Sequence, residues 1–209
     1  MPPTFTRLAT EGGPTLPFVR QRHCLSDQQP LIALFQAISD EQGWNPGNQL
    51  QAYPRNSAYF GLFALGENGE ETLIGGLQLV TGNGDEGLPV LTVWPELGLW
   101  GNPHVADIAL LALSREHRGR PELFWLLCVE MWRYCRGHEI TDLWVEVTPA
   151  KLALYRRLGW PLRIAGELRL HWGEACHPCT MTTEEVRQAL ETKARTSATY
   201  RRYLELADC

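Results

Sequence analysis

One segment near the middle of the chain constrains the fold most, because it joins an apolar strand to a helix through a short basic turn. Val105 to Leu113 is an apolar run with strand character. Pro121 stands at the first position of a helix that runs to about Arg136, and Gly137 ends it. The exposed amides of such a helix start predict an anion site at the arginine-rich turn, with an ordinary solvated turn as the alternative.

The rest of the pattern places helices and strands on both sides of this segment. In chain order it predicts a helix over 31–43, strands over 58–65, 72–80, 88–94 and 105–113, a helix over 121–136, a strand over 140–147, a helix over 149–158, strand character over 160–172, and a last helix over 183–206. This order favours an α+β fold with a mostly antiparallel sheet that is splayed in its middle.

The length of 209 residues fits one domain. We expect a single domain over residues 1–180 and a C-terminal helix over 181–209 that packs on the domain or on a partner, such as the second copy in a homodimer. The longest apolar run spans only 108–113, and the first residues lack the pattern of a secretory signal, so no membrane span is expected. The expected location is cytoplasmic, with the six cysteines as free thiols.

The charge distribution argues against a nucleic-acid partner. The net charge is -5, whereas binding to nucleic acid needs a basic face that releases counterions. Residues 1–114 carry a net charge of -7 and residues 115–169 carry +3. The basic zone is either a solvated mixed surface or a docking face for an acidic or phosphorylated partner.

The strand and helix after the basic zone resemble the end of the GNAT acyltransferase domain. In Leu143 to Pro149 and Ala153 to Trp160, a tyrosine stands four residues before a Gly-aromatic pair. In that superfamily the tyrosine faces the sulfur of a thioester, so the resemblance implies that Tyr155 protonates the departing thiolate. A core tyrosine with a satisfied hydroxyl is the alternative.

Within that superfamily, Tyr155 to Glu167 is most similar to the acyl-homoserine lactone synthases and the long-chain N-acyl amino acid synthases. The resemblance spans about residues 30–170. It implies an αβα-layered GNAT-like fold and transfer of a fatty-acyl group from a thioester directly to the amine of a small acceptor, such as an amino acid. A CoA-dependent acetyltransferase of small amines and a non-catalytic GNAT-like binding module remain as alternatives.

The basic turn departs from the pyrophosphate loop of that superfamily. Where R-x-x-G-x-G is usual, the chain has Arg118-Gly119-Arg120-Pro121-Glu122-Leu123. An acyl carrier protein, whose phosphopantetheine lacks the pyrophosphate of CoA, fits this loop and the local positive charge, while acyl-CoA stays the alternative donor. The candidates for holding the donor are Leu111, Leu113, Arg115, Arg118, Gly119 and Arg120, with Arg156 and Arg157 as further contacts to a carrier protein.

The acceptor side keeps little of the acyl-homoserine lactone pattern. Where those synthases carry charged residues, the chain has Leu34, Gln51, Pro54, Gln78 and Leu110, so an adenosylated methionine is disfavoured. Asp107 and Trp44 are retained in kind. Asp107, Glu96, Glu146 and His104 are candidate bases near the expected strand ends, and spacing singles out none of them. We select Asp107 and Glu146, with a surface or structural role as the alternative for each. The candidate acceptor contacts are Trp44, Gln78 and Trp144.

Cys176 and Cys179 form a lone C-x-x-C pair. Zinc sites usually show a second pair of ligands, and no strand-turn-helix context supports redox chemistry. We therefore expect loop cysteines and no metal, with zinc or redox chemistry as the alternatives.

Overall fold

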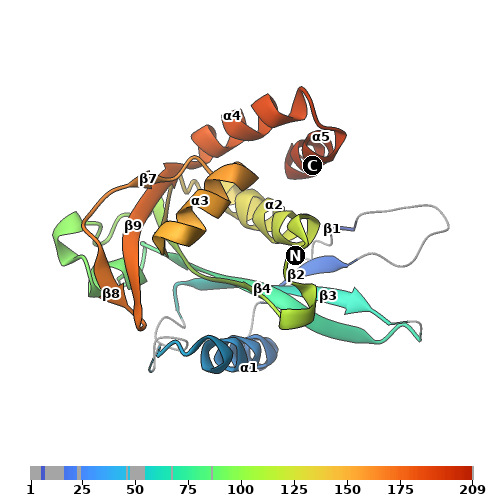
Figure 1. The fold of residues 1–209 in the computed structure, drawn as a ribbon, viewed down its shortest axis with the longest axis horizontal. Coiled ribbons are helices and arrows are strands. Elements are labelled where there is room, and N and C mark those ends of the chain that lie inside the picture. Colours follow the sequence, from blue (N-terminus) through green and yellow to red (C-terminus); the bar gives the residue numbers. More distant parts are fainter. Residues whose placement is uncertain are drawn as a thin grey trace.

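A sheet of nine strands forms the centre of the computed structural model, which describes residues 6–7, 17–22, 25–45, 47, 55–66, 68–85 and 87–208 (Figure 1). Along the sheet the strand order is β1-β2-β3-β4-β5-β6-β9-β7, and β8 pairs with β9. Among the described strands, only β5 and β6 pair in parallel. The strands are β1 (Thr6–Arg7), β2 (Phe18–Arg22), β3 (Ser57–Leu65), β4 (Glu71–Thr81), β5 (Val105–Leu113), β6 (Asp142–Val147), β7 (Arg163–Ile164), β8 (Arg169–His171) and β9 (Glu174–Thr182).

Helices cover both faces of the sheet, which confirms the predicted α+β class. One face carries α1, and the other carries α2 and α3 with the C-terminal pair α4 and α5 (Figure 1). The helices are α1 (Leu25–Gln42), α2 (Pro121–Gly137), α3 (Pro149–Leu158), α4 (Thr183–Ala194) and α5 (Ala198–Asp208), and the short 3-10 turns are η2 (Pro89–Thr92), η3 (Pro95–Leu97) and η4 (Arg115–His117).

Four expectations about individual elements were wrong. The expected strand over 88–94 is the 3-10 turn η2, because Pro89 lacks the N–H that a ladder needs and the Val90 N–H bonds to Asp107 instead. The helix expected to begin at Leu31, after Pro30, begins at Leu25 and contains Pro30 in its interior. The single helix expected over 183–206 is two helices, and within 160–172 only the short strands β7 and β8 form.

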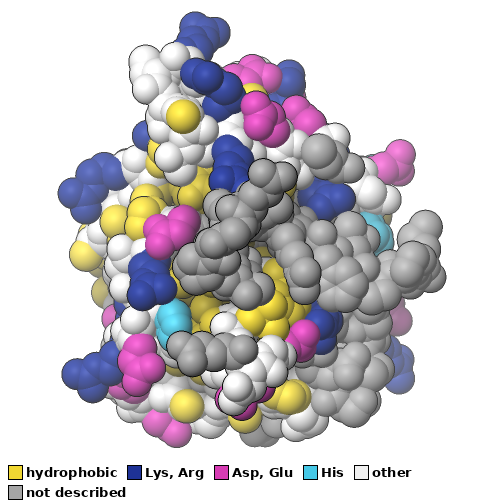
Figure 2. Space-filling view, turned by 90° about the vertical axis from the view of Figure 1, so that its right-hand side faces the viewer, with side chains coloured by type: hydrophobic (Ala, Val, Ile, Leu, Met, Phe, Trp, Pro, Cys, Tyr) yellow, Lys and Arg dark blue, Asp and Glu magenta, His cyan; other side chains and the backbone are white. Residues whose placement is uncertain are grey.

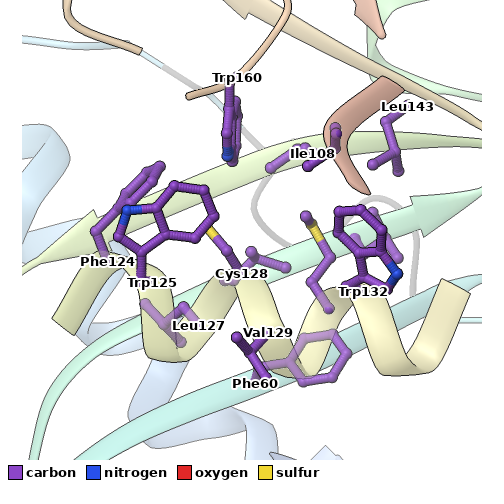
Figure 3. Close-up of a cluster of buried hydrophobic side chains, with 14 of the residues drawn as sticks. Phe60, Ile108, Phe124, Trp125, Leu127, Cys128, Val129, Trp132, Leu143 and Trp160 are labelled. Carbon is purple, nitrogen blue, oxygen red and sulfur yellow. The ribbon is translucent and has the colours of Figure 1, made fainter. Parts of the chain in front are cut away.

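Helix α2 is the main support of the core. Its residues from Leu123 to Trp132 are all buried, because the sheet covers one side and the C-terminal helices cover another. Figure 3 shows Trp125, Cys128 and Trp132 of this helix packed with side chains from the strands. On the outer side, Trp125 stacks on Tyr203 of α5 with ring centroids 5.6 Å apart. The final helix therefore completes the burial of α2.

The gap that matters for function opens between β5 and β6. These strands pair only over Val105–Asp107 and Asp142–Trp144, after which they separate. Strand β6 instead continues its pairing with β9 as far as Val147 and His177. The far halves of β5 and β6 thus leave a space that side chains from several elements line.

The described surface mixes both signs of charge. On the face in Figure 2, Lys and Arg side chains alternate with Asp and Glu around the margin. Among the described helices, none combines the length and the apolar character that a membrane span requires.

Helix α1 packs against β4 at a point where only glycine fits. A Cβ at Gly76 would lie 2.9 Å from the Phe60 carbonyl oxygen and would collide with Leu31 of α1. We expect Gly76→Ala to lower the free energy of unfolding by about 1–3 kcal/mol through overpacking. Thermal or denaturant unfolding checks this. Gly137→Ala is the control, because its Cβ meets nothing within 4 Å, and an equal loss in both variants would contradict the packing argument.

Candidate active site

Two cavities lie along the gap beside β5. The inner cavity, with a volume of about 130 Å³, lies between β5 and the end of β6. The outer cavity, of about 520 Å³, lies between the end of β5, the start of α2 and α3. Both cavities are lined by Trp44, Leu111, Lys151 and Tyr155, so they meet at these four residues.

Apolar side chains form the wall of the outer cavity, and basic groups lie at one end of it. The apolar residues come from α1, β5, α2 and α3, namely Ile38, Leu111, Ala112, Leu113, Phe124, Leu154 and Leu158. Arg118, Gly119 and Arg120 line the end next to α2. This arrangement suits a long, mostly apolar arm with an anionic group at its outer end.

Arg118 has a structural partner in this loop. Its two terminal nitrogens donate to the carboxylate of Glu41, each at 2.9 Å, and its Nε donates to the Leu113 carbonyl at 3.1 Å. The guanidinium accordingly lowers the pKa of Glu41. Arg118 therefore ties the basic turn to α1, while the exposed side chains of Arg115 and Arg120 make no hydrogen bond or ion pair with any described residue.

Tyr155 stands where the two cavities meet. Its ring packs between Phe124 and Trp160, with centroid distances of 5.8 and 5.1 Å. The hydroxyl makes no hydrogen bond with any described residue. Burial raises the pKa of Tyr155 to about 12, so the phenol keeps its proton at neutral pH and can donate it in a hydrogen bond.

Two carboxyl groups interact directly beneath the inner cavity. Glu146, on β6, lines the cavity, and Asp107, on β5, lies wholly buried behind it and accepts the Val90 N–H at 2.7 Å. One buried oxygen of each carboxyl has no hydrogen-bond partner among the described residues. Burial raises the pKa of both groups, and the repulsion between them raises that of Glu146 further. The pair therefore holds a proton at pH values where a solvated carboxyl has lost it.

The remaining wall of the inner cavity is aromatic and closed by a backbone contact. His171 stacks on Trp172 with centroids 4.9 Å apart, and burial lowers the His171 pKa to about 4. The imidazole is thus neutral at physiological pH. The Asn45 N–H donates to the Trp172 carbonyl at 3.1 Å, which joins the turn after α1 to the turn between β8 and β9. Trp44, beside that contact, has a buried Nε1 without a partner among the described residues.

Two expected acceptor contacts lie away from both cavities. Gln78 is buried in the sheet, where its Nε2 donates to the hydroxyls of Ser57 and Tyr59, each at 3.0 Å. Trp144 packs against a different cluster that includes Val90 and Trp94. Neither residue lines the inner or the outer cavity.

Several of the predicted donor contacts and candidate bases bind other parts of the protein or lie outside both cavities. Arg156 donates twice to the Leu162 carbonyl, at 2.9 and 2.7 Å, and so fixes the loop after α3. Glu96 forms an ion pair with Arg169. His104 contacts the Glu139 carbonyl, and Arg157 is exposed on α3 outside both cavities.

Three residues of the inner cavity with charged or imidazole side chains were not among the predicted site residues: Lys151, His171 and Glu174. Lys151 had a usable signal, because it precedes Tyr155 by four residues on α3 and side chains at that spacing share a helix face. His171 and Glu174 lie on β8 and β9, whose hairpin the sequence pattern did not separate.

Cys176 and Cys179 lie in strand β9, so the expectation of loop cysteines was wrong. They are three residues apart, and side chains on a strand alternate, which puts the two thiols on opposite faces. Cys176 lines the inner cavity, whereas Cys179 packs in the main core. Two thiols on opposite faces cannot bind one metal ion together. No group of three or more metal-binding side chains occurs among the residues that the structure describes.

Solved structures of acyl-transferring enzymes share this fold. FeeM, an N-acyl amino acid synthase from uncultured soil microbes, superimposes with a TM-score of 0.69 at 19% identity over 83% of this chain and 94% of its own. The acyl-homoserine lactone synthase LasI gives 0.63 at 15% identity, over 85% and 95% of the two chains. The CoA-dependent acyl-homoserine lactone synthase BjaI gives 0.59 at 14%, over 84% and 90%.

No family model and no curated protein sequence matches the chain. At these identities the structural likeness establishes the fold, and it confirms the resemblance to the GNAT acyltransferases at that level.

We expect the buried carboxyl pair to lower the free energy of unfolding at neutral and alkaline pH. Below the ordinary carboxyl pKa near 4, the group is protonated in both the folded and the unfolded state, so its raised folded-state pKa does not change the free energy of unfolding. As the pH rises above 4, the carboxyl ionises more readily in the unfolded state, and the free energy of unfolding falls. Glu146→Gln removes this cost and can still donate to Asp107. We expect it to raise the free energy of unfolding by about 1 kcal/mol at pH 8 and by much less at pH 4.

Denaturant unfolding at the two pH values measures the effect of Glu146→Gln. Glu184→Gln on the exposed side of α4 is the control, because hydrogen bonds from Arg187 and Gln188 hold its pKa below rather than above the ordinary value. A loss of stability in Glu146→Gln at pH 8 would show that the carboxylate is held in its charged form.

Proposed function

We propose that the protein is an N-acyltransferase that moves an acyl group from a thioester to the amine of a small acceptor such as an amino acid. The acyl group that we favour is a fatty-acyl group. The observation that carries the proposal is the meeting of two unlike cavities at the Tyr155 phenol. The outer one is larger and mostly apolar, and the inner one is small and is lined by Glu146 and Glu174. The likeness in fold to known N-acyl synthases supports the same reading.

The thioester donor would enter through the outer cavity. Its pantetheine arm would lie along Leu111 and Leu113 of β5, with its phosphate near Gly119 and Arg120 at the start of α2. The loop lacks the glycines that wrap a CoA pyrophosphate, and Arg115 and Arg120 are free to meet an acidic carrier protein. These features favour an acyl carrier protein over CoA.

The reaction is a direct attack without a covalent enzyme intermediate. The acceptor nitrogen attacks the thioester carbonyl carbon, a C–N bond forms, and the C–S bond breaks. The Asp107–Glu146 pair, which shares one proton, takes the proton that the nitrogen must lose: the shared proton moves to Asp107, and Glu146, which lines the cavity, accepts the new one. Tyr155 donates a hydrogen bond to the departing sulfur. Because its pKa is near 12, full proton transfer to a thiolate of pKa about 8.5 is uphill, and the thiolate takes its proton finally from Glu146 or water.

A second candidate function follows from the size of the inner cavity. At about 130 Å³ it has little room for a long acyl chain together with an acceptor. A short-chain acyl-CoA, such as acetyl-CoA, would then be the donor. The acyl-chain preference of the purified protein separates the two functions.

Tyr155→Phe tests the role of the phenol. We expect it to lower turnover about 10- to 100-fold while the fold is retained, since only a hydroxyl is lost. Mass spectrometry of lipid extracts from bacteria that express the chain, the variant or an empty vector measures the product. Tyr200→Phe, on α5, is the matched control. N-acylated amines that persist at the same level in Tyr155→Phe would reduce Tyr155 to a packing residue.

Arg120→Glu tests the carrier-protein donor. We expect the KM for an acyl carrier protein thioester to rise about tenfold or more, because the substitution places a negative charge in the path of an acidic partner. The KM for the small acyl-pantetheine thioester should change by less than about threefold. Steady-state kinetics with both donors measures the difference, and Arg187→Glu on α4 is the control. Equal changes with both donors would exclude a carrier-protein contact at Arg120.

A further inference from the structure

One cationic side chain lies at the meeting point of the two cavities, and the reaction as proposed gives it no role. Lys151 lines both cavities. It precedes Tyr155 by one turn of α3, so the two side chains share a face of that helix. Its ammonium lies 4.4 Å from the centroid of the Trp44 ring and 3.2 Å from the Glu174 carboxylate.

Local stability does not explain a lysine at this position. Lys151 is the third residue of α3, and its backbone N–H donates to the Thr148 hydroxyl at 3.3 Å. A positive charge in the first turn opposes the helix dipole. The ion pair with Glu174 is more than a third exposed on both sides, with side-chain exposures of 38% and 39%, and such pairs contribute little.

The ammonium has donor capacity left for a ligand. It carries three N–H groups, and Glu174 accepts one of them. Glu146 lines the same inner cavity, and one of its buried oxygens has no hydrogen-bond partner among the described residues. The inner cavity therefore offers a positive group beside Tyr155 and the Glu146 carboxyl for proton exchange, which matches a ligand that carries an anion and an amine close together.

We propose that Lys151 binds the carboxylate of the acceptor and thereby selects α-amino acids over simple amines. This inference rests on the proposed N-acyl transfer and names its acceptor class. In an α-amino acid one carbon separates the amine from the carboxylate. An amine placed to attack a thioester at Tyr155 thus brings its carboxylate within reach of the neighbouring ammonium.

The inner cavity sets a limit on the side chain of that amino acid. Its aromatic walls are Trp44, Tyr155, Trp160, His171 and Trp172. A cavity of roughly 150 Å³ holds a benzene ring, so about 130 Å³ favours a small or medium apolar side chain. Glu174 then serves as a positioning residue that holds the ammonium at the rim when no acceptor is bound.

Matched pairs of acceptors test this assignment. The pairs are alanine with ethylamine and leucine with 3-methylbutylamine, each amine being the amino acid without its carboxylate. The donor is decanoyl carrier protein or decanoyl-CoA. For the wild type we expect kcat/KM to favour each amino acid over its amine by at least about tenfold, the effect of one charge-assisted contact.

Lys151→Met supplies the decisive comparison. We expect it to remove most of that preference through a higher KM for the amino acid, while kcat/KM for the amine changes by less than about threefold. Lys151→Arg should restore part of the preference. Arg187→Met, which removes a charge on α4, should leave the preference unchanged.

The outcomes separate the two levels of the argument. An equal fall for amino acids and amines in Lys151→Met, or no change in either, overturns the assignment of Lys151. So does a wild type that acylates both acceptor classes equally well. A wild type that acylates neither class with either donor overturns the proposed function itself, and the acceptor class with it.

Discussion

The separation of β5 from β6 after Asp107 and Trp144 is the constraint on which the site depends. A parallel pair that continued would fill the space with backbone and leave no cavity. Strand β6 keeps its full pairing with β9, while β5 leads away into the basic turn. Strands β5 and β6 form one wall of the cavities, and α3 contributes Tyr155 and Lys151. The turns after α1 and β8, joined by the Asn45–Trp172 hydrogen bond, close the inner end.

The polar side chains that line this gap contribute little to the stability of the fold. The carboxyl pair is buried, and one oxygen of each carboxyl and the Tyr155 hydroxyl have no hydrogen-bond partner among the described residues. Lys151 stands in the first turn of a helix. The apolar packing of α2 against the sheet and α5 offsets these costs. Polar groups left unsatisfied inside a well-packed core are typical of sites that are completed by a ligand.

The sequence predicted best where one local signal dominates. The turn from β5 into α2 carries Pro121 and Gly137 at its helix boundaries, and Tyr155 stands in a recognisable strand and helix. Prediction failed where tertiary contacts decide. The segment 88–94 has strand character, but Pro89 and the buried Asp107 hold it as a 3-10 turn. Gln78 aligns with a substrate contact, yet its amide satisfies hydroxyls inside the sheet. His171 and Glu174 enter the site through a hairpin with only a weak pattern.

The central claim is that the thioester sulfur and the acceptor amine meet at Tyr155, one from each cavity. A crystal structure with a non-reactive thioether analogue of acyl-pantetheine tests it most directly. The account predicts the sulfur within about 3.5 Å of the Tyr155 hydroxyl, with the arm along Leu111 and Leu113 and the carbonyl carbon facing Glu146. An arm bound elsewhere on the protein, or one whose sulfur lies away from Tyr155, would contradict the account.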